Sequence, residues 1–254
     1  MFHTIFYEPI YNLLVIVLTY IPLHDIGAAI IIVTVFVKLI LLPLNMSALR
    51  SQYLMKRLEP QMNKLKEMQK TNPQEASKKM MELYKIEKIN PFASLFVIVL
   101  QIPIFFALYF VFSKGLHPDV NSIYSFVKFP DSLHTEAFGL FDVTKRSIFI
   151  AVLAGLSSYI LARRQTMTMN TKKENKEESF QDQFMKSMKI QLLYVLPVII
   201  GVSAAALPSA LGLYWFVSNM IGYLQDVYIK HKLAHLIMPQ VSELDKLYIA
   251  SQQK

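Results

Sequence analysis

The chain contains no cysteine, seven glycines and one tryptophan among its 254 residues. Without cysteine there is no disulfide-stapled outer domain and no lipid-modified cysteine at a processed N-terminus. Seven glycines leave little material for a Gly-rich loop that cradles phosphates. The six histidines lie outside the long apolar blocks and lack the paired spacing of a zinc-binding helix. These absences predict a chain that uses no metal and no cofactor.

Acidic residues are almost missing from the apolar blocks, where Asp226, near the end of the last block, is the sole acid. A protease that works inside a membrane needs paired acids, a Ser/His pair or a zinc motif within the bilayer. None of these arrangements is present in the blocks. We therefore expect no catalytic residues, and we do not expect an enzyme.

Hydrophobic residues make up 54% of the chain and charged residues 17%, and the hydrophobic ones gather in long blocks. This pattern is typical of an all-α integral membrane protein. Each block approaches the roughly 17–25 residues of a spanning helix, whereas a barrel strand needs only about ten alternating residues. We expect five spans, at residues 26–46, 91–112, 147–163, 190–206 and 209–229, the last two separated by a turn at Leu207-Pro208.

The positions of Lys and Arg predict how these spans are oriented. Segment 47–90 carries ten, segment 163–189 seven and the tail 230–254 four, whereas residues 1–37 carry none. Loop 113–146 carries four, balanced by four acids. Because positively charged loops stay in the cytoplasm, we expect the N-terminus and loop 113–146 outside and the C-terminus inside.

The segment before the first span, residues 1–25, contains a second and shorter apolar block. Ile10 to Ile21 is only a dozen residues long, follows Glu8-Pro9 and has no basic residue before it. It fits neither a spanning helix nor a typical signal peptide. We expect an interfacial helix on the outer face. The alternative is a sixth span, which would place the N-terminus in the cytoplasm.

Segment 47–90 predicts a cytoplasmic helical hairpin. Apolar residues recur three and four apart from Leu54 to Met68, stop at Thr71-Asn72-Pro73 and resume from Ala76 to Leu83. Six methionines between Met46 and Met81 could offer an adaptable surface to hydrophobic clients or simply fill the seam between the two helices. Loop 164–189, with MNTKKENKEES at its centre, is typical of a solvated linker.

Lys38 is the first cation of the chain and lies inside an apolar span. A lysine near the centre of a membrane helix costs about 2.5–3.5 kcal/mol, and such a cost usually marks a function. The alternative is that its stem reaches the headgroups, since Lys38 is roughly 9 Å from the Leu44 end at about 1.5 Å per residue. Thr34 lies one turn earlier on the same helix face.

Other polar and aromatic residues lie inside the predicted spans. Gln101 and Asn219 are costly to bury in lipid, so each should face another helix or water. Serines in membrane helices more often serve helix packing than a solute path. Trp215 is deeper than the interfacial belt, and together with Tyr214 it should pack against neighbouring helices or line a cavity.

Six sequence strings follow one another along the chain. They are FVKLILLPLN, ELYKIEKINPF after a charged hairpin, QIPIFFALYFVF, FGLFDVTK, LLYVLPVIIGV and LPSALGLYWFVSN. Their order and spacing resemble the YidC/Oxa/Alb family of membrane protein insertases, over nearly the whole chain. The resemblance implies a five-helix core around a hydrophilic groove that is open to the cytoplasm and to lipid and closed on the outer side. In that groove a client's polar segment is received before the client slides into the bilayer.

The resemblance also assigns residues to the groove. The family's groove cation falls on Lys38, where most bacterial members have arginine, and Thr34 matches the polar residue one turn away. Ile102, Phe105 and Trp215 match positions that contact the client's hydrophobic segment. With Gln101 and Tyr214 these residues form the expected client-binding groove.

The resemblance favours a minimal bacterial insertase of the plasma (inner) membrane that serves nascent membrane proteins in the lipid bilayer and for which a monomer is expected to be sufficient. The ribosome and a Sec-type channel are further candidate partners, although the four cations of the tail are a weak signal for ribosome contact. The competing function is a small-anion transporter or channel with Lys38 as its binding site. That function gives no role to the basic hairpin.

Overall fold

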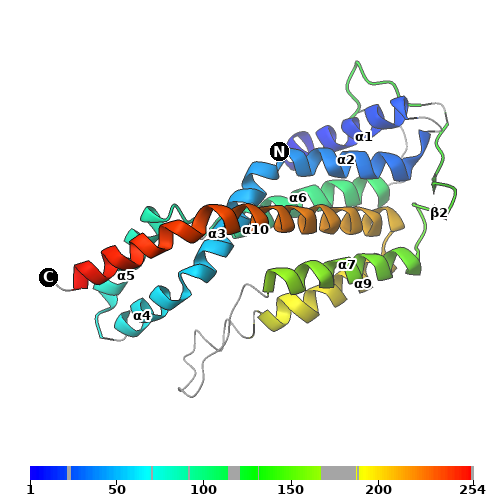
Figure 1. Ribbon diagram of the computed structural model, residues 1–254. Helices are drawn as coiled ribbons and strands as arrows, with labels where there is room; N and C mark the ends of the chain where they lie inside the picture. Colours follow the sequence, from blue (N-terminus) through cyan, green and yellow to red (C-terminus); the bar gives the residue numbers. More distant parts are fainter. Residues whose placement is uncertain are drawn as a thin grey trace.

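The computed structural model describes residues 1–21, 24–69, 71–90, 92–113, 121–130, 132–166, 187 and 189–252, and for residues 59, 60, 66, 94, 95, 98 and 233–252 only the backbone. The described chain is mostly helical. Figure 1 shows helices α1, α2, α6 and α10 lying lengthwise together, with the pair α7 and α9 beneath them. Helices α4 and α5 extend from one end, and a small β-hairpin lies at the other. The predicted linker 164–189 falls almost entirely outside the described residues.

The N-terminal helix is longer than the apolar block predicted. A π-helical stretch, η1 (His3–Tyr7), continues directly into α1 (Glu8–Tyr20). Pro9 lies just after the π-helical stretch and has no backbone N–H to donate to the helical ladder. The helix buries Leu14, Val15 and Leu18 against α2 and α6. Its place at the outer membrane face remains a prediction.

The first predicted span is bent. Helix α2 (Ile26–Ile40) ends at Leu41, and α3 (Leu42–Arg57) continues at 63° to it. Pro43 explains the break, because it lacks an N–H and its ring would clash with the carbonyl of Leu39 in a continuous helix. The span predicted at 26–46 therefore stops being straight at Ile40. By length and composition α2 and α3 could cross a bilayer together, whereas no single helix among the described residues is both long and apolar enough to do so.

The hairpin is built from α4 (Glu59–Gln69) and α5 (Pro73–Ile86), which pack together. Asn72 caps α5 by accepting a hydrogen bond from the backbone N–H of Glu75 at 3.2 Å, so the break falls where the Thr71-Asn72-Pro73 pattern predicted it. The segment that leads to the hairpin begins earlier than the predicted residue 47, because α3 already starts at Leu42. Leu54 of α3 and Leu58, which directly follows α3, are buried together with Ile89. This contact fixes the base of the hairpin.

The remaining helices are α6 (Ala93–Ser113), α7 (Ile148–Thr166), η3 (Gln191–Val195) with α9 (Leu196–Ala206), and α10 (Ser209–Gln252). The turn at Leu207-Pro208 lies between α9 and α10, as predicted. Helices α7 and α9 cross closely at Gly155 and Gly201, where a Cβ on Gly155 would lie 3.4 Å from the Cα of Gly201. Helix α10 has 44 residues, roughly 66 Å at about 1.5 Å per residue, so residue 229 is not its end.

A two-stranded β-hairpin interrupts the otherwise helical structure of the described residues. Strands β1 (Glu136–Ala137) and β2 (Phe141–Asp142) pair antiparallel through a turn in which Phe138 and Gly139 have positive φ. Asp25 joins this hairpin to α2, because its carboxylate accepts from the N–H groups of Ala28 at 3.0 Å and Phe138 at 2.7 Å. Gly27 permits the close contact, since a Cβ there would lie 2.3 Å from the Cβ of Ala137.

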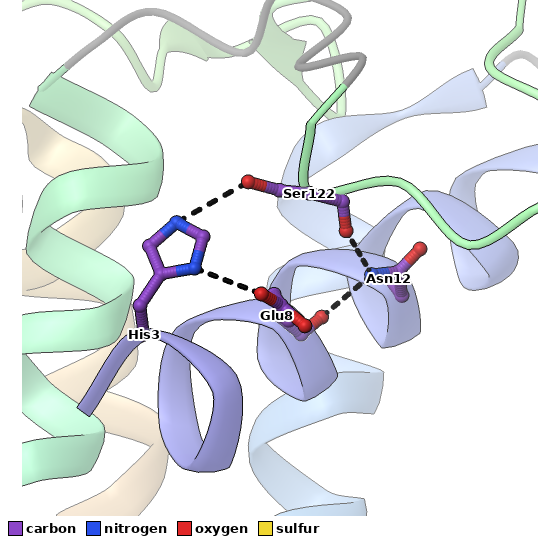
Figure 2. A network of polar contacts seen from close by, with 4 residues as sticks. All are labelled: His3, Glu8, Asn12 and Ser122. Carbon is purple, nitrogen blue, oxygen red and sulfur yellow. Dashed lines mark hydrogen bonds and ion pairs between the residues drawn. The ribbon is translucent and has the colours of Figure 1, made fainter. Parts of the chain in front are cut away.

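Loop 121–130 lies along α1 and is joined to it by polar contacts. Figure 2 shows the ring of His3 between Glu8 and Ser122, at 2.9 and 3.3 Å. The buried amide of Asn12 donates to the carbonyls of Glu8 at 2.8 Å and Ser122 at 2.7 Å (Figure 2). The oxygen of the Asn12 side chain accepts from the N–H of Tyr124 at 2.7 Å. Further along α1, Thr19 donates to the carbonyl of Lys128 at 3.1 Å, so the loop follows the helix over two turns.

Candidate functional site

Lys38 lies in the last turn of α2 and is half-buried. Its ammonium donates to the side-chain oxygen of Gln101 on α6 at 3.3 Å. The amide nitrogen of Gln101 in turn donates to the hydroxyl of Tyr214, which is buried on α10. One chain of hydrogen bonds therefore links three helices that lie side by side in Figure 1. Three of the residues predicted for the groove meet here.

Thr34 is placed differently from a solvent-facing groove residue. It lies one turn before Lys38 on α2, as predicted, and is buried. Its hydroxyl donates to the carbonyl of Ile30 at 2.6 Å, within the same helix. This bond takes up the one proton of the Thr34 hydroxyl within α2. Thr34 therefore contributes only a small polar surface beside Lys38.

The predicted hydrophobic contacts lie next to this polar chain. The rings of Phe105 on α6 and Trp215 on α10 stack, with centroids 4.9 Å apart and planes at 19°. Such offset pairs contribute about 0.5–1.5 kcal/mol beyond their buried area. Ile102 is 51% exposed and extends the apolar face of α6 beside Gln101. The seven predicted residues therefore come from α2, α6 and α10. Lys38, Gln101 and Tyr214 are joined by hydrogen bonds, and the rings of Phe105 and Trp215 stack.

Ser218 on α10 adds a side-chain hydrogen bond to Tyr214, whereas Asn219 belongs to a separate polar group. The amide of Asn219 on α10 donates to the hydroxyls of Ser157 at 3.1 Å and Ser158 at 2.7 Å on α7. Both serines also donate to the carbonyl of Ala154. This group fastens α7 to α10, as expected of serines that serve helix packing.

A second cluster lies near the C-terminal end of α7, and the sequence did not reveal it. The buried carboxylate of Asp226 on α10 pairs with the guanidinium of Arg164 on α7 and accepts from the hydroxyl of Tyr53 on α3 at 3.0 Å. Arg164 also lies over the ring of Tyr223, 4.9 Å from its centroid. Burial and the charge of Asp226 raise the pKa of Tyr53 above its ordinary value, so the hydroxyl stays protonated and donates. The one signal in the sequence was an acid inside an apolar block.

Among the described side chains, no carboxylate pairs with Lys38. The ion pairs between described side chains involve His3, Lys79, Lys145 and Arg164, and not Lys38. A neutral amide satisfies one of the three ammonium donors and does not cancel the charge. The described residues also hold no cluster of His, Cys, Asp or Glu that could bind a metal ion. The arrangement can thus attract an anionic group.

Comparison with known proteins identifies the family of this chain. Residues 17–236 match the model of the family described as 60Kd inner membrane protein. A membrane protein insertase YidC from Clostridium tetani is 32% identical over 209 residues, which cover 82% of this chain and 83% of that protein. The one from Fusobacterium nucleatum is 30% identical over 207 residues, covering 81% and 86%.

A longer relative matches over the same part of this chain. The membrane protein insertase YidC of Magnetococcus marinus is 30% identical over 212 residues, which are 84% of this chain and 33% of that protein. The match to the family model covers most of the chain, from α1 into α10, and includes every residue of the Lys38 site. The resemblance to YidC-type insertases is confirmed, and the chain belongs to the 60Kd inner membrane protein family.

Proposed function

We propose that this protein is a membrane protein insertase of a bacterial inner membrane. The family match and the names of its relatives support this assignment. In the proposal α2 with the start of α3, α6, α7, η3 with α9 and the first half of α10 cross the bilayer, and α1 lies on the outer face. The hairpin α4–α5 and the rest of α10 extend into the cytoplasm.

The observation that carries the mechanism is the uncompensated charge of Lys38. A cation on an apolar helix is stable only when water or a polar partner reaches it. Gln101 supplies one partner, and the half-buried position leaves room for water. We therefore place a hydrophilic groove between α2, α6 and α10, with Lys38 inside it.

Client capture follows from this arrangement. Moving a polar tail through hydrocarbon is costly because its backbone and charged groups lose water, and a wet groove shortens the dry path. An acidic residue of the tail would replace the oxygen of Gln101 at the Lys38 ammonium, since a carboxylate binds a cation more strongly than an amide does. Ile102, Phe105 and Trp215 would accept the client's apolar helix. Partition of that helix into lipid drives the reaction without a nucleotide.

Lysine in place of the family's usual arginine weakens one part of this capture. Arginine offers a planar fork that binds a carboxylate through two bonds, whereas lysine is a point charge on a flexible stem. Lys38 should therefore attract acidic tails without fixing their orientation. Gln101 compensates in part, because it holds the ammonium in one place before the client arrives.

Contacts at the other end of the molecule support the proposed orientation. Loop 121–130 lies along α1, held at Asn12 and Thr19, and belongs to the segment with balanced charge. A non-helical loop alongside half a helix favours an interfacial position over a sixth span, because lipid cannot satisfy a loop backbone. The basic hairpin α4–α5 lies at the opposite end (Figure 1), which agrees with a cytoplasmic hairpin.

The partners that follow from the proposal are nascent membrane proteins and the surrounding lipid. One chain supplies every side chain of the site, so a monomer is sufficient. A Sec-type channel and the ribosome remain proposed partners, with no described side chain that argues for either.

Reconstitution in liposomes tests the function. Purified protein should insert a short single-span client with an acidic tail, and Lys38→Met should lower the initial insertion rate about tenfold. Lys145→Gln is the matched control, because it removes an exposed cation that pairs with Asp142 in the outer loop. A chain that moves small anions into empty liposomes and inserts no client would be a transporter instead, and the insertase proposal would be wrong.

A further inference from the structure

Helix α3 is held on two opposite sides. The hydroxyl of Ser51 accepts from the N–H of Asn90, just before α6, at 3.2 Å. The hydroxyl of Tyr53 donates to Asp226 on α10 at 3.0 Å. Two residues along a helix turn the side chain by about 200°, so these contacts lie on opposite faces of α3. Helix α3 thus lies between the start of α6 and the middle of α10, and it carries the hairpin beyond it.

The two bonds to Asp226 differ in what their loss would cost. Asp226 is 1% exposed, and Arg164 pairs with it from α7, a helix already fastened to α10 through Asn219. If Tyr53 leaves, the carboxylate keeps its cation. If Arg164 leaves, a buried charge loses its main partner, which is far more costly. The hydrogen bond between Tyr53 and Asp226 is therefore the one that can open, whereas the ion pair between Arg164 and Asp226 stays formed.

The position of this cluster relative to the Lys38 site gives it a role. Asp226 follows Tyr214 by 12 residues on α10, roughly 18 Å along the helix at about 1.5 Å per residue. Helices α2 and α3 meet at the 63° bend at Leu41, three residues after Lys38. A rotation of α3 about that bend would move the hairpin toward or away from the end of the site that we assign to the cytoplasm.

We propose that Tyr53 and Asp226 form a latch, and that Arg164 positions the Asp226 carboxylate for it. When the latch is closed, α3 lies against α10 and holds the hairpin in the position that it has in this structure. When Tyr53 is released, α3 pivots at Leu41 and the entrance to the Lys38 site widens. The role at an entrance rests on the proposed function, whereas the latch itself rests only on the three-helix contact.

Distance measurements test the latch in the absence of any client. The natural lack of cysteine allows spin labels at Ser77→Cys in α5 and Lys230→Cys in α10, both exposed positions. Tyr53→Phe removes the hydroxyl and keeps the ring. Because a hydrogen bond to a charged acceptor is lost, the ratio of released to latched molecules should rise roughly ten- to a hundredfold. The distance distribution of the labelled pair in nanodiscs should shift accordingly.

Tyr84→Phe is the matched control, since it removes the same hydroxyl from within the hairpin and should leave the distribution unchanged. Asp226→Asn is the second variant: a neutral oxygen is a weaker acceptor, so it should shift the distribution in the same direction as Tyr53→Phe. If Tyr53→Phe and Tyr84→Phe give the same distribution, there is no latch. Because this readout needs no insertion, a protein that fails to insert clients would overturn the proposed function and leave the latch standing.

Discussion

Asn12 should control whether the outer loop stays on α1. Its buried amide bonds the carbonyl of Ser122 and the N–H of Tyr124, both at 2.7 Å. Asn12→Ala removes both bonds and leaves those two backbone groups without these partners. Losing the part-buried bond to Tyr124 costs about 1 kcal/mol, and leaving the buried carbonyl of Ser122 without its donor costs about 1–3 kcal/mol, so the docked loop should lose about 2–4 kcal/mol.

A cysteine at the docked position reports this loss directly. Ser122 is 2% exposed, so Ser122→Cys should react with an impermeant maleimide only when the loop opens. When opening and closing are fast, the labelling rate follows the population of the open form. At about 1.36 kcal/mol per factor of ten, Asn12→Ala should raise that rate roughly 30- to 800-fold.

Thr19→Val provides the control for this measurement. It removes the bond to the carbonyl of Lys128, which is solvent-exposed, so water can replace it and the rate should rise only a few-fold. The reasoning would be refuted by an Asn12→Ala protein that labels at the rate of the parent, because the Asn12 contacts would then contribute nothing to docking.

Three further predictions follow from the packing and the charges. Thr4→Cys should react with impermeant maleimide added to intact cells, or to spheroplasts, whereas Ser77→Cys should react only after lysis; a Thr4 site protected until lysis would make α1 a span. Gly212→Ala should lower the midpoint of thermal unfolding, because its Cβ would lie 2.7 Å from a methyl group of Ile150 on α7. Gly222→Ala should not, because its Cβ meets only the flexible end of the Leu161 side chain, and equal midpoints for the two variants would contradict the close packing at Gly212. Arg164→Leu should lower the free energy of unfolding by about 2–4 kcal/mol, less than for a fully buried pair because the Arg164 side chain is 25% exposed. In a double-mutant cycle, adding Asp226→Leu should recover part of this loss, and additive losses would contradict the pairing.

The helices of this protein could largely be predicted, and their bends and ends could not. Long apolar blocks set where α6, α7, α9 and α10 lie, because each block needs one length of helix. The bend at Leu41 was missed since Pro43 sits within an uninterrupted apolar run. The continuation of α10 to Gln252 was missed because a rise in charge marks the membrane surface and does not end a helix.

The site shows the same division between local and distant information. Lys38 and Thr34 were found because a cation and a hydroxyl stand out one turn apart in an apolar span. The partner of Lys38 is 63 residues away, and the partners of Asp226 are 62 and 173 residues away. Spacing along the chain carries no signal at such separations. The cluster of Tyr53, Arg164 and Asp226 could therefore be recognised only from the folded structure.

The measurement that tests the central claim most directly is the dependence of insertion on the charge of the client's tail. Three single-span clients that differ only in two tail residues, Asp, Asn or Lys, would be offered to proteoliposomes containing the parent, Lys38→Arg or Lys38→Met. If Lys38 attracts the tail, the parent and the arginine variant should insert the acidic client about tenfold faster than the neutral one, and the methionine variant should insert both at similar rates. A Lys38→Met protein that keeps the full preference for acidic tails would contradict the account and leave Lys38 as a lysine whose stem reaches the membrane surface.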